Sequence, residues 1–385
     1  MTPALAEILT SLVRTESVNP GTSEKAMADV VQGWLEGTVD ELSVIEFSPG
    51  RPSVAAVVQG GRSGPTLVLN GHMDTVPIDD ESLWTTDPFG AEIRDGYLYG
   101  RGACDMKGGL AVQIAVARYI ASLPRSEFHG SLVLHFAAGE ERGEPGTLSL
   151  LKAGFGGDYG ITTEPTSLRV ATSTRGSAYY RIEIKGRSAH AGQAELGRNP
   201  IWFLPAVLRT LNTYDEEVRS LRHSLLPGGS CTPTVIRAGV KENAVPDHCQ
   251  VTLDRRLLPG ETAEGVRSEL VKRLQAASTA DSGFDFEITT TIEVEPAEVD
   301  PTSKFVQSVL QAAEETTGTH AEVWGAPFSS DVRNLVNDGG IEAVTFGPGD
   351  IGECHCPDER VSLHEMEVAA HTITKVAMGM VAVSG

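Results

Sequence analysis

Apolar and polar residues follow two different periods along the first part of the chain. Over residues 5–13 and 110–123 the apolar positions have the spacing of an amphipathic helix, and Ser23 is placed to cap another helix that runs to Trp34. Short apolar runs of strand length occupy residues 53–58, 66–69 and 131–138. Alternating helices and buried strands predict an α/β fold in which helices cover a sheet.

The pattern changes near Gly176 and changes back near Val294. Between these points it predicts strands and helices of a self-contained α+β domain, at residues 178–184, 200–211, 234–240, 249–255 and 263–277. After Val294 it predicts a helix at 303–317 and a short strand at 343–346. We therefore expect one domain made of residues 1–175 and 294–385, and a second domain, residues 176–293, inserted into it.

Length and composition agree with a two-domain globular protein. The chain has 385 residues, more than one ordinary core holds, with 40% hydrophobic and 22% charged residues. Its formal charge is -21, from 31 Lys+Arg against 52 Asp+Glu. A protein with this much negative charge repels phosphate backbones and anionic lipids. We therefore expect neither nucleic-acid nor membrane partners.

The chain lacks the sequence features of an exported or membrane protein. Its first residues include acidic side chains and lack a basic region followed by an apolar stretch, so they do not read as a signal peptide. No stretch approaches the roughly 20 apolar residues of a membrane span. The five cysteines are scattered and odd in number. This arrangement is typical of a reducing compartment, so we expect a cytoplasmic protein.

Four clusters of histidine or acidic residues each follow a strand-like run. They are His72 with Asp74, Asp105, Glu140 with Glu141, and Glu164. Ligands gather at the carboxyl ends of strands in open α/β sheets, where these clusters can converge. So many carboxylates at close range could not all stay ionised without a cation. Imidazole and carboxylate ligands favour zinc, with Co²⁺ or Mn²⁺ as substitutes.

Each cluster has an ordinary explanation when it is taken alone. His72 would be a hydrogen-bonded core histidine, Asp74 a helix cap, and the pair Glu140 and Glu141 a solvated turn. The glycines around Arg101 lack the spacing of a dinucleotide-binding loop. It is the occurrence of all the clusters in this order that favours a common site.

The histidine and acidic clusters lie within two long sequence motifs and within short motifs that follow them along the chain. Residues 71–77 read Gly-His-Met-Asp-Thr-Val-Pro, and residues 99–109 read Tyr-Gly-Arg-Gly-Ala-Cys-Asp-Met-Lys-Gly-Gly. Short motifs follow at 139–141, 164–166, 186–190, 254–260 and 347–349. Nearly end to end, the chain resembles the M20 metallopeptidase family, which includes acetylornithine deacetylase, succinyl-diaminopimelate desuccinylase, glutamate carboxypeptidase and aminoacylases. The resemblance implies a zinc-peptidase-like catalytic domain, with a central mixed sheet flanked by helices, and an inserted α+β lid that serves in dimerisation.

The resemblance also implies a complete ligand set for two zinc ions per chain. Asp105 is similar to the carboxylate that bridges both ions. His72 and Glu164 would complete the shell of one ion, and Glu141 and His355 that of the other. The peptide bond after the bridging aspartate is implied to be cis.

Further residues resemble those that act on the substrate. Asp74 is similar to the carboxylate that orients a metal-bound imidazole, and Glu140 to the general base. In the inserted domain, His190 resembles a histidine that stabilises the oxyanion, often from the partner subunit of a homodimer. Arg256 is similar to an arginine that binds a substrate carboxylate, and Asn243 to an asparagine that contacts substrate.

Two assignments have local rivals. Arg255 and Arg256 would lie on opposite faces of a strand, and the family spacing favours Arg256. His364 is a rival to His355, but the acidic segment that normally follows the ligand stands directly after His355. Relatives often have alanine where Cys354 stands here. The run Cys354-His355-Cys356 has poor spacing for a zinc-thiolate site.

We therefore expect a di-zinc amidohydrolase that cleaves the amide bond of an N-acyl amino acid, of deacetylase or desuccinylase type, with a metal-bridging water as nucleophile. A dipeptidase or carboxypeptidase of the same family is the close alternative, because no motif reports on the acyl pocket. A non-catalytic binding homologue is disfavoured by the intact ligand set with Glu140, and a metal buffer by the scattered thiols.

Overall fold

The computed structural model describes residues 2–21, 23–280 and 283–379 and divides into two compact units. Unit 1 comprises residues 1–172, 298–325 and 330–385, and unit 2 comprises residues 173–297 and 326–329. The expected junctions lie within a few residues of these bounds. Segment 326–329, which belongs to unit 2, was expected in the other domain.

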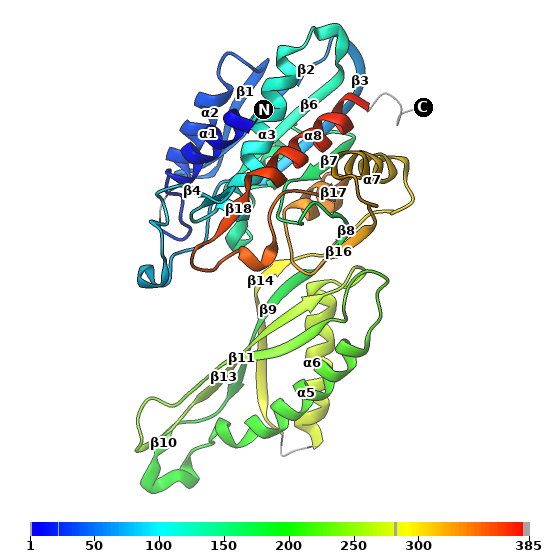
Figure 1. The fold of residues 1–385 in the computed structure, drawn as a ribbon. Coiled ribbons are helices and arrows are strands. Elements are labelled where there is room, and N and C mark those ends of the chain that lie inside the picture. Colours follow the sequence, from blue (N-terminus) through cyan, green and yellow to red (C-terminus); the bar gives the residue numbers. More distant parts are fainter. Residues whose placement is uncertain (1, 22, 281–282, 380–385) are drawn as a thin grey trace. The chain divides into compact units, whose positions relative to one another are not determined.

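Unit 1 is built on the central mixed sheet that the resemblance implies (Figure 1). Its strands β6, β3, β7 and β17 are neighbours and run parallel, whereas β1 and β2 are antiparallel. The order across the sheet is β1 (Glu41–Ser48), β2 (Arg51–Gln59), β6 (His129–Ala137), β3 (Arg62–His72), β7 (Tyr159–Thr162), β17 (Glu342–Thr345), β8 (Val170–Thr174) and β15 (Ala297–Glu298), with β16 (Val323–Ala326) paired to β8.

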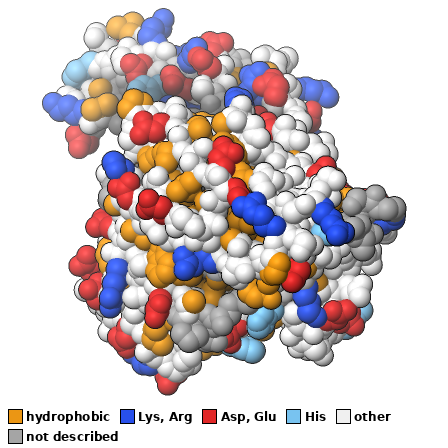
Figure 2. Space-filling model, turned by 90° about the horizontal axis from the view of Figure 1, so that it is seen from above, with side chains coloured by type: hydrophobic (Ala, Val, Ile, Leu, Met, Phe, Trp, Pro, Cys, Tyr) orange, Lys and Arg blue, Asp and Glu red, His pale blue; other side chains and the backbone are white. Residues whose placement is uncertain are grey.

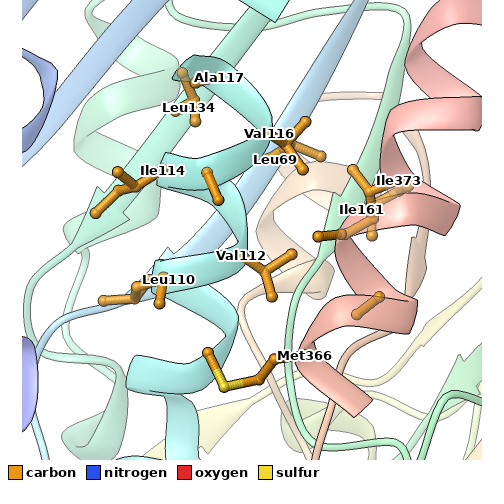
Figure 3. Packing of buried hydrophobic residues seen from close by; sticks show 14 of the residues in the cluster. Leu69, Leu110, Val112, Ile114, Val116, Ala117, Leu134, Ile161, Met366 and Ile373 are labelled. Atoms are coloured by element: carbon orange, nitrogen blue, oxygen red, sulfur yellow. The ribbon is translucent and has the colours of Figure 1, made fainter. Parts of the chain in front are cut away.

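Helices cover this sheet, and α3 (Gly108–Ser122) is buried on nearly every side, as expected of a core helix. Figure 3 shows Val112 and Val116 of α3 among Ile161 of β7 and residues Met366 and Ile373 of α8 (Leu363–Gly379). The other helices of unit 1 are α1 (Thr2–Val13), α2 (Lys25–Leu35), α4 (Gly146–Lys152) and α7 (Lys304–Thr317).

A separate three-stranded sheet in unit 1 corrects one expectation. It consists of β4 (Glu92–Arg94), β5 (Tyr97–Tyr99) and β18 (Arg360–Ser362). The strand that precedes Asp105 is β5, so it belongs to this small sheet and not to the central one. The pairing of β5 with β18 brings the segment after Tyr99 beside the segment before Arg360.

Unit 2 has a four-stranded antiparallel sheet with helices on one face. The strand order is β11 (Ser230–Ala238), β13 (His248–Leu257), β9 (Gly176–Lys185) and β14 (Asp285–Val294). Alternate residues of β13 are buried against a core that includes residues of α5 (Leu204–Ser220) and α6 (Ala263–Ala280). A short ladder joins β10 (Ala189–His190) to β12 (Ala244–Val245).

The surface of the described residues carries many charged side chains. Acidic and basic side chains are interspersed on the face shown in Figure 2. Within residues 2–21, 23–280 and 283–379, no helix is both long and apolar enough to span a membrane.

Candidate metal centre

Three parallel strands of the central sheet deliver histidine and carboxylate side chains to one edge. His72 is the last residue of β3, Glu140 and Glu141 begin the short helix η4 (Glu140–Arg142) after β6, and Glu164 lies two residues beyond β7. Because β6, β3 and β7 run parallel, their carboxyl ends meet at the same edge.

Asp105 reaches the same edge from the segment Ala103–Lys107, directly before α3. The Asp105–Met106 peptide is cis, as the resemblance implies. The start of α3 lies very close to the end of β7, since a Cβ atom at Gly109 would lie 2.1 Å from the carbonyl oxygen of Thr163. Only glycine allows this approach, which sets Asp105 beside the residues that follow β7.

The two carboxylate oxygens of Asp105 face two different histidines. Oδ1 lies 3.1 Å from His72 Nε2, and Oδ2 lies 3.1 Å from His355 Nε2. His72 Nε2 is also 3.7 Å from Glu164 Oε1, and His355 Nε2 is 3.4 Å from Glu141 Oε1. Asp105 thus stands between two pairs, each of one histidine and one glutamate.

The donor atoms are close enough to share a metal ion. His72, Asp105 and Glu141 can each offer one ligand atom, and these atoms lie within 4.8 Å of one another. Among the described residues, Glu141 Oε1 is buried and accepts no hydrogen bond of good geometry, although His355 Nε2 lies 3.4 Å away. A buried carboxylate oxygen without a donor is unfavourable, and a cation would satisfy it.

Charge at the cluster is poorly balanced when no cation is bound. Burial raises the pKa of Glu141 and of Glu164, and the charge of Asp105 raises both further. Burial alone would also raise the pKa of Asp105, but hydrogen bonds from His355 and His72 outweigh it and hold that pKa well below its usual range.

The carboxylates of the cluster raise the pKa values of the two histidines. The hydrogen bond with Asp105, followed by the contact with the Glu141 carboxylate, raises the pKa of His355 to about 10. Burial would lower the pKa of His72, but Glu164 and Asp105 raise it well above its ordinary value. Both shifts favour protonated imidazoles beside these carboxylates, and a divalent cation would supply the positive charge in their place.

Asp74 connects one histidine to the turn that carries Glu140 and Glu141. Its carboxylate accepts hydrogen bonds from the backbone N–H of Gly139 at 2.9 Å and of Glu140 at 3.1 Å, and its Oδ1 lies 3.6 Å from His72 Nδ1. The side chain of Asn19 donates to the other oxygen at 2.9 Å. Asp74 is fully buried and so fixes this turn relative to His72.

Glu359 is a residue of this site that the sequence patterns did not single out as functional. Its buried carboxylate accepts hydrogen bonds from the backbone N–H of Gly102, Cys104 and Asp105 at 2.9–3.0 Å and from Arg101 Nη1 at 2.6 Å. It therefore fixes the backbone that presents Asp105. The available signal was its place in the acidic segment that follows His355.

The residues expected to contact substrate lie in unit 2, at two separate places. His190 and Asn243 are neighbours across the β10–β12 ladder, where Ala191 N–H donates to the Asn243 carbonyl at 2.9 Å. Arg256 lies near the far end of β13, on the face opposite the helices, and Arg255 is fully buried.

The rival ligand His364 lies elsewhere. It is the second residue of α8 and lines a separate hollow with Leu168 and Thr317. His355 is thus the histidine that the structure brings to Asp105.

The described donor set fits a divalent metal ion: buried oxygen and imidazole nitrogen atoms, one orphaned carboxylate oxygen, and an excess of carboxylates at the edge of an α/β sheet. Metal-dependent hydrolases are one class of protein with such a centre. Residues 68–379 match the sequence model of peptidase family M20/M25/M40, and the chain belongs to this family. It is accordingly a metal-dependent hydrolase of amide or peptide bonds.

Similar proteins cover almost the whole chain. A succinyl-diaminopimelate desuccinylase of Methylorubrum extorquens is 30% identical over 379 residues, 93% of this chain and 94% of its own length. The N-formyl-4-amino-5-aminomethyl-2-methylpyrimidine deformylase of Bacillus subtilis is 28% identical over 375 residues, 87% of this chain and 85% of its own length. Among solved structures, the M20 family metallo-carboxypeptidase Sso-CP2 of Sulfolobus solfataricus has the same fold, with a TM-score of 0.80, 21% identity and 98% coverage of both chains.

Replacing Glu359 tests whether it positions Asp105. Glu359→Gln keeps the shape but turns an NH₂ group toward backbone N–H donors. We expect zinc affinity to fall by about 10- to 100-fold, although Glu359 touches no metal. Competition with a chromophoric chelator measures this affinity.

The neighbouring Asp358 provides the matched control. Its carboxylate accepts from the N–H and hydroxyl of Thr85, away from Asp105, and asparagine tolerates its φ of 55°. Asp358→Asn should bind zinc like the unmodified chain. Equal affinities in all three proteins would show that Glu359 does not position Asp105.

Proposed function

We propose that the chain is a di-zinc amidohydrolase that removes the acyl group of an N-acyl amino acid. The observation that carries this proposal is the Asp105 carboxylate, whose two oxygens each face a histidine backed by a glutamate. One carboxylate between two such pairs suits a bridging ligand for two ions. A donor set of imidazole and carboxylate favours zinc.

The relatives with the higher identity support deacylation over peptide cleavage. The proteins that are 28% and 30% identical are named for removing a formyl and a succinyl group. The solved carboxypeptidase is only 21% identical, so it bears on the fold alone. Location in the cytoplasm and the absence of nucleic-acid and membrane partners remain predictions from charge and cysteine content.

In this proposal His72 and Glu164 would hold one ion, Glu141 and His355 would hold the other, and Asp105 would contribute to both. Bound zinc would lower the pKa of a water molecule and polarise the scissile carbonyl. The protein contributes the placement of these ligands.

Glu140 is the residue proposed to move the proton. Among the described residues, its carboxylate takes part in none of the ion pairs of the cluster, which leaves the group available beside the ligands. Burial raises its pKa well above the ordinary value, which suits a base that accepts the proton of the attacking water and returns it to the leaving amine. Asp74 holds its backbone N–H and so restricts where Glu140 can lie.

Two adjacent substitutions separate proton transfer from metal binding. We expect Glu140→Gln to retain two zinc ions per chain and to lose about two to four orders of magnitude in kcat, because it removes only the base. Glu141→Gln should lower the zinc content instead, because it removes a ligand. Elemental analysis and steady-state rates on the same samples measure both. If Glu140→Gln releases zinc and Glu141→Gln does not, the two roles are wrongly assigned.

A substrate comparison tests the function itself. We expect zinc-loaded protein to hydrolyse acetyl, succinyl or formyl amino acids faster than dipeptides with the same carboxyl-terminal residue, and Glu140→Gln to lose that activity. The amine released on hydrolysis is measured. Faster hydrolysis of the dipeptides would favour the dipeptidase or carboxypeptidase alternative. Failure to cleave either class would reject the proposal.

Unit 2 is proposed to complete the site as a lid. His190 Nδ1 accepts a hydrogen bond from Gly192 N–H at 3.0 Å, so the neutral ring carries its proton on Nε2. The side chain is exposed. An exposed imidazole N–H is a suitable donor for a developing oxyanion.

The distance between His190 and Arg256 supports a lid that acts on a second copy of the chain. The eight-residue step from His248 to Arg256 along β13 spans roughly 26 Å, at about 3.3 Å per residue. His190 lies beyond the His248 end, because Ala244 is its ladder partner. A small substrate cannot contact both His190 and Arg256 of one chain, but it can contact one residue from each of two chains.

The edge of unit 2 offers a surface for such a second copy. β11 is one of the two edge strands of the four-stranded sheet, and its Val235 and Ile236 are 40% and 48% exposed. Trp202, in the short helix η6 (Pro200–Phe203), is 79% exposed. Unpaired edge strands and exposed apolar side chains favour association, which supports the proposed homodimer.

Mixing of variants tests supply of His190 by the partner. His190→Ala should depress kcat by about two to three orders of magnitude and leave zinc content unchanged. A mixture of His190→Ala with Glu140→Gln should regain activity after subunit exchange, because each mixed dimer contains one intact composite site. Rates are measured before and after exchange, which is followed by mass spectrometry of the native dimer.

His190→Ala mixed with Asn243→Ala is the control. Both changes lie on the same part of the lid, so every site in a mixed dimer meets one damaged lid and no rescue is expected. If neither mixture regains activity despite exchange, His190 acts within its own chain or takes no part.

A further inference from the structure

Two cysteines beside the proposed metal ligands are in direct contact. Cys104 Sγ and Cys354 Sγ lie 3.4 Å apart, although 250 positions separate them in the chain. The S–H groups of both donate to the same acceptor, the Asp350 carbonyl oxygen, at 3.3 Å and 3.6 Å. Both are free thiols.

The loop that brings the thiols together is well anchored. Asp350 Oδ1 accepts from Gly352 N–H at 2.8 Å, and Oδ2 accepts from the Ser167 hydroxyl at 2.9 Å. A Cβ atom at Gly349, which has φ of +93°, would lie only 2.6 Å from Cys104 Sγ. A larger residue there would push the loop off Cys104, so the close approach of the thiols depends on this glycine.

The two thiols differ in mobility and access. Cys104 is 1% exposed, and its backbone N–H is held by Glu359 at 2.9 Å. Cys354 is only partly buried, directly after the short helix η8 (Ile351–Glu353). An oxidant would therefore meet Cys354 first, and Cys354 is the partner that can move.

We propose that Cys104 and Cys354 are a site of reversible oxidation, at which a peroxide converts the two thiols into a disulfide. The Cys354 sulfur attacks one peroxide oxygen, the O–O bond breaks, and a sulfenic acid and one water form. The Cys104 sulfur then attacks the Cys354 sulfur and displaces hydroxide, which leaves as water with the Cys104 proton. Two electrons pass from the thiols to the peroxide.

The remaining cysteines have different surroundings. Cys356 Sγ donates to the Glu353 carbonyl at 3.1 Å. Cys231 and Cys249 lie in unit 2 and are buried. The contact between Cys104 and Cys354 therefore favours this pair over Cys354 with Cys356, its near neighbour in sequence.

Closing the disulfide would move a proposed metal ligand. A disulfide has an S–S distance of about 2.05 Å, so the two sulfur atoms must move closer together by about 1 Å or more. Because Cys104 is held by Glu359, the movement falls on Cys354 and on His355, whose side chain is about half exposed. A displaced ligand lowers metal retention and slows turnover. The effect on turnover rests on the proposed function, whereas disulfide formation does not.

The experiment treats zinc-loaded, full-length protein with hydrogen peroxide and then with dithiothreitol. We expect loss of two of the five thiols, a mass lower by two hydrogen atoms, and one cross-linked peptide that joins Cys104 to Cys354. We expect the rate to fall by about 100-fold and less zinc to survive dialysis against a chelator. Dithiothreitol should restore all five readouts.

Variants give the controls. Cys354→Ala should form no cross-link and should keep the same rate and zinc content with and without peroxide. Cys356→Ser should respond to peroxide like the unmodified protein. A Cys354–Cys356 cross-link, or oxidation of single thiols without a cross-link, would overturn the proposed pair. A Cys104–Cys354 cross-link that leaves zinc retention unchanged would overturn its effect on His355 while leaving the proposed function intact.

Discussion

Repulsion among buried carboxylates is the constraint on which the rest of the structure depends. The edge of the central sheet gathers Asp105, Glu140, Glu141 and Glu164 around two imidazoles, and burial raises the pKa of the three glutamates. Such a cluster persists only if positive charge occupies it and the backbone holds it in place. The parallel strands, the glycine contact at the start of α3 and the hydrogen bonds of Glu359 all serve that second requirement.

The sequence predicted what depends on local pattern and on contiguous motifs. The α/β class, the family and the cis peptide after Asp105 are confirmed. The ligand roles of His72, Glu141, Glu164 and His355 remain predictions, although the structure gathers these residues around Asp105.

Long-range pairing is what the sequence could not supply. The short strand before Asp105 carries no sign of its partner, so its membership of a separate sheet became visible only through its pairing with β18. Glu359 looks like any acidic residue of a loop until its four donors are in place. Strand alternation predicts that Arg255 and Arg256 lie on opposite faces of β13. It does not predict that Arg255 is the buried one, because that depends on the helices packed against its face of the sheet.

The place of β17 in the central sheet has a consequence for biosynthesis. β17 spans Glu342–Thr345 and inserts between β7 and β8, which lie about half a chain earlier. During translation the sheet therefore stays open at its middle until residues 342–345 have left the ribosome. His355 and Glu359 emerge later still. A nascent chain that ends before these residues thus lacks both the second histidine and the residue that fixes Asp105, and the proposed metal centre cannot form until they have been added.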